Sequence, residues 1–130
     1  IKIMISLDEL FIINKMLVEK FGGMGVGFNN LHLAESLVVQ VDQEVFGKIL
    51  YPSTIDKISF IVFSIIANHV FLDGNKRTGA FVLDKLCEDN NIPLQCNDDA
   101  IIDVVLKIAT SEFNREDLSK WIFVNSKEKH

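Results

Sequence analysis

The most informative stretch of this chain comprises residues 53–79, STIDKISFIVFSIIANHVFLDGNKRTG. Its first half is almost entirely apolar, and Ser53 and Thr54 are both suitable caps for a helix that we expect from Ile55 to about His69. A helix this apolar must be covered on nearly all sides, so we expect it at the centre of the domain. Its second half changes abruptly to polar and charged residues.

Five other segments carry apolar residues at helical spacing, with caps or glycines at their ends. Between the second and third helices, residues 48–52 suit an extended piece or a small hairpin better than another helical turn. The sequence therefore predicts an all-α fold, a single compact domain over residues 1–130 with about six helices and a short hairpin. The five further helices are expected at about 7–20, 31–45, 76–87, 98–110 and 115–124. We expect Asn75 to cap the helix at 76–87 and Phe81 to face inward from it.

The composition excludes several classes of protein. The chain has 130 residues and a formal net charge of −5, so no global basic field favours binding to nucleic acid or to anionic lipid. The longest apolar run, residues 58–67, is about half of what a membrane-spanning helix needs. With only Cys87 and Cys96 and no signal-peptide pattern, we expect free thiols and a reduced, cytoplasmic location.

The polar segment after His69 has the composition of a phosphate site. Lys76 and Arg77 fall in the first turn of the expected fourth helix, where the helix dipole favours anions. Asp73 lies beside them, and a carboxylate next to phosphates commonly holds Mg²⁺, while His69 can exchange a proton near neutral pH. Each residue also has an ordinary alternative: a capping or core histidine, a turn aspartate and a solvated pair of cations.

The order of these residues resembles the signature of the Fic family, H-x-F-x-[DE]-G-N-G-R-x-x-R. A lysine after the asparagine is typical of its Doc branch, the death-on-curing toxins of toxin–antitoxin systems. Flanking residues throughout the chain, such as Tyr51-Pro52 and Trp121, look like landmarks of the same branch. The signature is matched in order by His69, Phe71, Asp73, Gly74, Asn75 and Arg77, with Lys76 in the Doc position.

The resemblance implies a Mg²⁺-dependent enzyme that uses ATP. His69 would be the general base that deprotonates a hydroxyl group of a protein target, and Asp73 would hold Mg²⁺ on the nucleotide phosphates. Phe71 would anchor the loop in the core. The phosphates would be bound by Gly74, Asn75, Lys76 and Arg77.

The resemblance also implies protein partners. Residues 46–52 look like the family's flap, so Ile49, Leu50 and Tyr51 would dock an extended part of the target by strand addition. The self-inhibitory pattern [ST]-x-x-x-E-[GN] has no match in the sequence, which fits restraint by a separate antitoxin chain.

The sequence departs from the family's patterns in two places. Ala80 stands where the signature ends in arginine, and with Lys76 this favours the Doc reaction, transfer of the terminal phosphate of ATP, onto elongation factor Tu in the type member. The alternatives are AMP transfer, as in other Fic enzymes, and a catalytically silent binding module. Asn29 and Asn30 stand where Doc-like sequences often carry Arg-Asp, so we expect a locally altered loop there.

Overall fold

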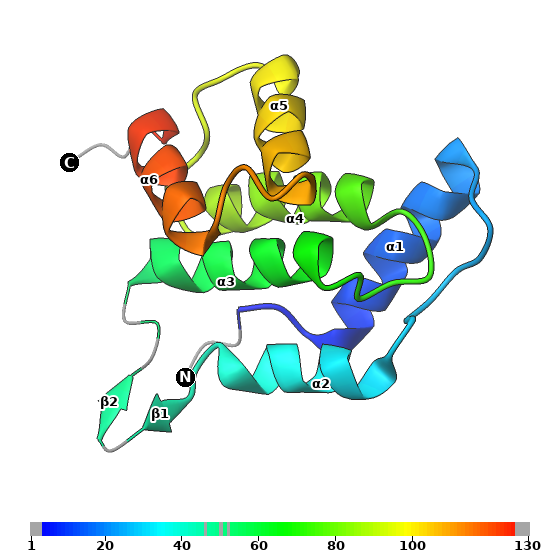
Figure 1. Ribbon diagram of the computed structural model, residues 1–130, viewed down its shortest axis with the longest axis horizontal. Coiled ribbons are helices and arrows are strands. Elements are labelled where there is room, and N and C mark those ends of the chain that lie inside the picture. Colours follow the sequence, from blue (N-terminus) through cyan, green and yellow to red (C-terminus); the bar gives the residue numbers. More distant parts are fainter. Residues whose placement is uncertain (1–3, 46, 50, 52, 127–130) are drawn as a thin grey trace.

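The computed structural model describes residues 4–45, 47–49, 51 and 53–126 (Figure 1). This part of the chain folds into six helices, with one two-stranded antiparallel hairpin between the second and the third, which confirms the all-α prediction. The elements are α1 (Leu7–Phe21), α2 (Leu31–Gln40), β1 (Glu44–Val45), β2 (Lys48–Ile49), α3 (Thr54–Ala67), α4 (Asn75–Asp89), α5 (Asp98–Ala109) and α6 (Arg115–Asn125).

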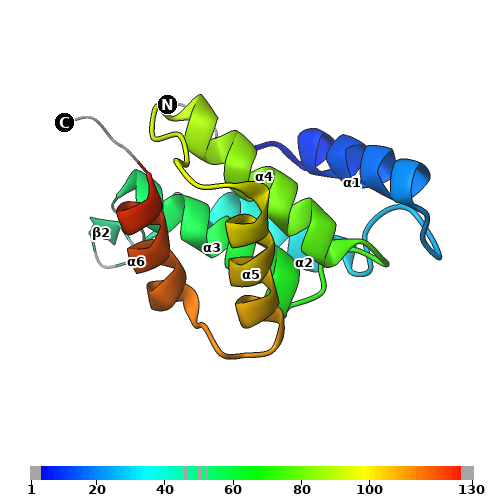
Figure 2. The same cartoon turned by 90° about the horizontal axis from the view of Figure 1, so that it is seen from above.

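Helix α3 is the centre of the fold, as its apolar sequence predicts. Figure 1 shows α2 on one side of α3 and α5 and α6 on the other, with α4 running beside it. In the view from above in Figure 2, α5 and α6 lie in front of α3 and α2 lies behind it. Helix α1 covers the flank of α4. Five apolar side chains of α3 are at most 2% exposed: Ile58, Ile61, Val62, Ile65 and Ile66.

Helices α3 and α4 pack closely because α4 carries a glycine at their contact. A Cβ atom on Gly79 would lie only 2.5 Å from Cγ1 of Ile66. Since α3 and α4 flank the polar segment, this close packing fixes the relative position of its two ends.

Side chains cap the start of five helices. Ser6, Asn30, Ser53, Asn97 and Asn114 each accept a hydrogen bond from a backbone N–H in the first turn of the helix that follows. Helix α4 is different, because its N-cap residue is Gly74 and no side chain among the described residues caps it.

Besides the cap of α4, which is described with the site, two details of the predicted helices are wrong. Helix α2 ends at Gln40 rather than near residue 45, because Nζ of Lys57 donates to the carbonyl of Val41 (3.0 Å) and to Asp42 (2.8 Å) and so caps its C-terminal end. Phe81 is 39% exposed, since the inward stripe of α4 consists of Thr78, Gly79, Val82, Leu83, Leu86 and Cys87.

No helix in the described ranges is long and apolar enough to cross a membrane. Cys87 and Cys96 are both free thiols, as predicted, and burial raises the pKa of Cys87 to about 12.

Candidate functional site

His69 is the first residue beyond the C-cap of α3, and its backbone is left-handed (φ 49°). The N–H of Val70 reaches back to the carbonyl of Ile65 (3.5 Å), as at many helix ends that finish in a left-handed residue. This conformation is uncommon without glycine, and such strain tends to occur at functional positions. It leaves the His69 side chain exposed on the wall of a cleft.

The N-terminus of α4 opens into the same cleft. Gly74, also left-handed (φ 74°, ψ 22°), is the N-cap residue, and Asn75, Lys76 and Arg77 form the first turn. By helix geometry their N–H groups have no partner within the helix, and among the described residues no side chain caps them. The positive end of the helix dipole and two cationic side chains therefore face the cleft together.

Asn75 is not the cap that the sequence predicts. Its Oδ1 accepts from the N–H of Phe71 (2.9 Å) and its Nδ2 donates to the carbonyl of Phe71 (3.0 Å). The residue at the N-cap position is Gly74, and its left-handed backbone turns the chain from this loop into α4. The side chain of Asn75 thus holds the loop closed, and its contact with phosphates stays a prediction.

The carboxylate of Asp73 is held by two backbone N–H groups. Oδ2 accepts from Met24 (2.6 Å) and Oδ1 accepts from Gly74 (2.7 Å). The bond from Met24 and then that from Gly74 lower the pKa of Asp73 most. Desolvation opposes them and ranks next, and the charges of Arg77 and Lys76 lower the pKa further. The group is therefore ionised at neutral pH.

Residues 22–30, which we call the glycine loop, pack against this segment. Phe71 is 1% exposed, as its predicted anchoring role requires, and its ring stacks on that of Phe28 with centroids 5.1 Å apart. Beside it, the N–H of Leu72 donates to the carbonyl of Gly27 (3.0 Å). The glycine loop and the polar segment therefore behave as one cross-linked unit.

The two asparagines of the glycine loop have clear structural roles. The N–H of Asn29 donates to Val70 (2.8 Å), and its Nδ2 donates to the carbonyl of His69 (3.3 Å), so Asn29 supports the strained backbone. Asn30 accepts from the N–H of Leu33 (3.1 Å) and caps α2, as an aspartate would.

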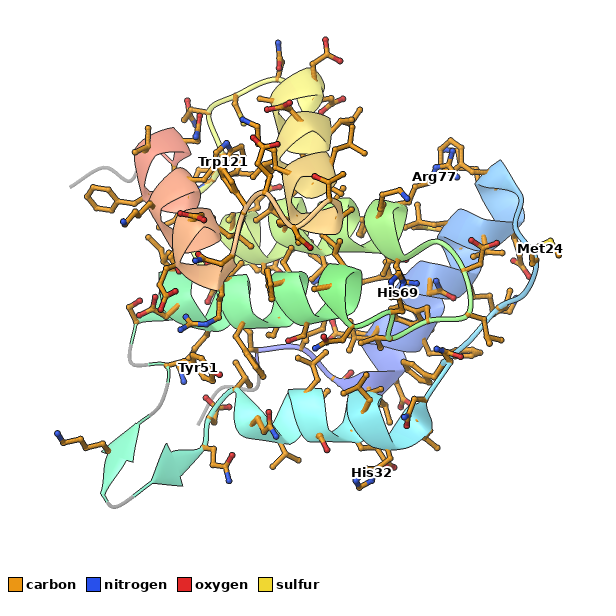
Figure 3. The ribbon with its side chains drawn as sticks, in the orientation of Figure 1. Met24, His32, Tyr51, His69, Arg77 and Trp121 are labelled. Atoms are coloured by element: carbon orange, nitrogen blue, oxygen red, sulfur yellow. The ribbon has the colours of Figure 1, made fainter. Side chains whose placement is uncertain are left out.

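The cleft has a volume of about 790 Å³ and unites most of the predicted residues. His69, Asp73 and the first turn of α4 form one wall, and Figure 3 shows His69 and Arg77 toward the same end of the molecule. The opposite wall is apolar except for Ser111 and comes from α5 and the turn after it. Sequence reasoning missed this wall, which consists of Ile102, Val105, Leu106, Ile108, Ala109 and Ser111.

One signal for the α5 wall was present in the sequence. Ile102 and Leu106, four residues apart, remain 53% and 46% exposed, while the other face of α5 is buried. An apolar stripe beyond what the core needs indicates a surface that contacts something else. On the opposite rim, the guanidinium of Arg77 lies 4.7 Å from the ring centre of Phe21, a cation–π contact that orients it.

The family model of the Fic/Doc family matches residues 4–87 of this chain. The chain belongs to the Fic/Doc family. Members of this family are generally transferases that bind ATP and act on proteins. A search of curated proteins finds no match to the sequence. The family match ends before α5, so the apolar wall of the cleft lies outside the matched region.

The structure does not bring the described residues of the predicted Fic/Doc flap next to His69. Ile49 pairs with Glu44 in the hairpin, and the ring of Tyr51 stacks on that of Phe60 (centroids 4.4 Å apart). Leu50 lies outside the described residues. The hairpin precedes the N-terminal end of α3 and His69 follows its C-terminal end. A helix of 14 residues is about 21 Å long, and Figure 3 shows Tyr51 and His69 far apart along it. Target docking at these residues stays a prediction.

Asp73 fits a magnesium ion that arrives with a nucleotide. Among the described residues no group of three or more His, Cys, Asp or Glu side chains could hold a metal by itself. Mg²⁺ usually needs only one or two carboxylates, since phosphate oxygens and water complete its coordination. An ionised carboxylate beside Lys76 and Arg77 provides this set of donors once phosphates are present.

Proposed function

We propose that this Fic/Doc protein transfers the terminal phosphate of ATP to a hydroxyl group of a protein, as Doc toxins do. The observation that carries the proposal is the start of α4. This helix end is capped by no side chain of the described part of the chain, bears Lys76 and Arg77, and opens into the cleft that contains His69. An anion is the missing partner for such a helix end.

ATP suits both walls of the cleft. Its phosphates would bind the N–H groups of Asn75, Lys76 and Arg77 and the two cationic side chains, while the N–H of Gly74 stays bonded to Asp73. Its nucleoside would extend along the apolar wall, against Ile102 and Leu106 of α5, whose exposed side chains would lose contact with water. One molecule with an anionic and a largely apolar end accounts for both surfaces.

Asp73 would hold Mg²⁺ at the phosphates. The ion would neutralise negative charge on the phosphate oxygens when bound. The chain itself keeps the carboxylate ionised and oriented, through the N–H groups of Met24 and Gly74.

His69 would act as the general base. A ring nitrogen of His69 takes the proton of the target hydroxyl, and the hydroxyl oxygen bonds to the γ-phosphorus as the bond to the β–γ bridging oxygen breaks. The products are a phosphorylated protein and ADP, and the proton on His69 then passes to solvent. The exposed position of His69 leaves it accessible to a side chain of a separate protein.

The choice of phosphorylation over AMP transfer is supported by Ala80. This residue lies in the cleft wall at the position where the family signature ends in arginine, so the described lining carries only two cations, Lys76 and Arg77. Fewer cations favour a different seating of the phosphates from that in AMP-transferring relatives.

Two protein partners belong to the proposal. The target would be a translation factor, such as elongation factor Tu. An antitoxin chain would inhibit the enzyme by blocking the cleft. Leu72, Phe81, Ile102 and Leu106 are exposed apolar residues at or near the cleft, and they suit contact with a protein.

The test is a labelling experiment with purified protein, Mg²⁺ and a bacterial lysate. Transfer of label from γ-labelled but not from α-labelled ATP to a protein of the size of elongation factor Tu is the expected result. The matched controls are His69→Ala, which should abolish labelling, and His32→Ala, an exposed histidine on α2 outside the cleft, which should not. Label from α-labelled ATP alone would instead indicate AMP transfer. Absence of both labels and of ATP binding would support a silent binding module.

A further inference from the structure

Asn14 is a polar residue in an apolar environment. It lies in the middle of the inward face of α1, between Leu10 and Leu17, and is 0% exposed. Burying an amide costs free energy unless its hydrogen bonds are replaced. Nothing in the predicted chemistry accounts for this residue.

All of the side-chain hydrogen bonds of Asn14 go to the polar segment, α4 and the glycine loop. Its Nδ2 donates to the carbonyl of Asp73 (2.9 Å) and to Oγ1 of Thr78 (3.2 Å), and its Oδ1 accepts from the N–H of Gly27 (3.1 Å). One side chain of α1 therefore joins the polar segment, the first turns of α4 and the glycine loop.

Asp73 is fixed from two sides as a result. Asn14 holds its main-chain carbonyl, and the N–H of Met24 holds its carboxylate. Met24 belongs to the same glycine loop that Asn14 holds at Gly27. The loop approaches so closely that a Cβ atom on Gly23 would lie 3.0 Å from Oδ2 of Asp73. A small shift of the loop must therefore displace the carboxylate or break its bond from Met24.

We propose that Asn14 is a positioning residue. It fixes the position of the glycine loop relative to the polar segment and so directs the carboxylate of Asp73 into the cleft. It acts through backbone groups and touches no substrate. The part that concerns Mg²⁺ rests on the proposed transfer from ATP, whereas the coupling of Asn14 to the Met24–Asp73 bond does not.

The structure provides a matched pair of variants. Asn14→Leu keeps the same number and branching of side-chain heavy atoms and removes all three hydrogen bonds. Thr78→Val removes only the bond to Thr78, which is equally buried, and leaves the bonds to Asp73 and Gly27 in place. A purely structural role predicts that both variants lose stability and change nothing else.

The first readout is the backbone amide resonance of Met24 in ¹H–¹⁵N NMR spectra. Asn14 makes no bond to Met24, so this amide reports the coupling and not the direct loss of a partner. We expect the Met24 amide proton of Asn14→Leu to move toward the position of a solvent-exposed amide, and that of Thr78→Val to stay unchanged. If Asn14→Leu does not fold, the smaller change Asn14→Ser is measured in the same way.

The second readout is the dependence of phosphate transfer on Mg²⁺. We expect Asn14→Leu to raise the half-saturating Mg²⁺ concentration about tenfold, because such a change corresponds to the free energy of about one hydrogen bond. Thr78→Val should leave this concentration as in the wild type. An unchanged Met24 resonance in a folded Asn14 variant, or equal effects of the two substitutions, would overturn the proposal. Lack of any transfer by the wild-type protein would refute the proposed function alone, because the NMR comparison does not depend on activity.

Discussion

The substitution Gly79→Ala probes the contact on which the geometry of the cleft depends. The added methyl group would lie 2.5 Å from Cγ1 and 2.6 Å from Cδ1 of Ile66. Ile66 is 2% exposed and β-branched, so its side chain has little freedom to move away. Since carbon atoms pack at about 3.5–4.0 Å, α3 and α4 must separate by about 1 Å.

The expected cost follows from two opposing effects. Overpacking a well-filled core typically costs about 1–3 kcal/mol, and a clash with two atoms of a rigid side chain belongs at the upper end. Alanine gains about 1 kcal/mol over glycine within a helix. We therefore expect Gly79→Ala to lower the free energy of unfolding by about 2 kcal/mol, which corresponds to a fall in Tm of about 8 °C for a chain of this size.

The assay is thermal and urea unfolding followed by circular dichroism, with Gly25→Ala as the matched control. A Cβ atom on Gly25 would lie 3.5 Å from Cδ1 of Leu72, an ordinary contact, so this variant should stay within about 0.5 kcal/mol of the wild type. A Gly79→Ala protein as stable as the wild type would refute the reasoning about the α3–α4 contact.

Four further predictions follow from the site and the core. His69→Gly should raise the free energy of unfolding by about 1 kcal/mol in urea titrations, because glycine suits the left-handed backbone, while abolishing transfer; a loss of stability would show that the His69 side chain packs rather than projects. Since the pKa of Asp73 is lowered on folding, its carboxylate contributes stability that is fully present above its ordinary value of 3.8 and is lost as the pH falls through the folded value. The stability difference between wild type and Asp73→Asn should therefore shrink in acid, and a difference independent of pH would contradict this. Ile102→Asp should weaken ATP binding about tenfold in calorimetry, whereas Ile12→Asp, on α1 outside the described cleft lining and 62% exposed, should not; equal affinities for both variants would remove α5 from the binding site. Burial raises the pKa of Cys87 to about 12, so iodoacetamide at mildly alkaline pH should modify this thiol only after unfolding, as mass spectrometry would show; rapid modification of the folded protein would contradict its burial.

The order of the helices could be predicted from the sequence because each has a local signal. The apolar period of α3 and its cap Ser53 are contained within a few residues, and the structure confirms them. The predicted cap of α4 was wrong because it, too, was read from a local signal. Asn75 resembles a cap in sequence, yet its amide bonds to Phe71, and this contact depends on the closed loop rather than on the first turn.

The residues of the site were easier to predict than its shape. The signature brings His69, Asp73 and the first turn of α4 together because they are close in sequence. The α5 wall and the bonds of Asn14 join segments far apart in the chain, so no local pattern could show which segment each one contacts. Asn14 was visible only as a polar residue on an apolar face.

The most direct measurement of the central claim compares wild-type protein with His69→Ala in two steps, ATP binding by calorimetry and then single-turnover transfer from γ-labelled ATP to a target protein. The account predicts equal ATP affinity, because the first turn of α4 binds the phosphates, and label on the target only with the wild type. Equal transfer by both proteins, or absence of ATP binding to the folded wild type, would contradict it.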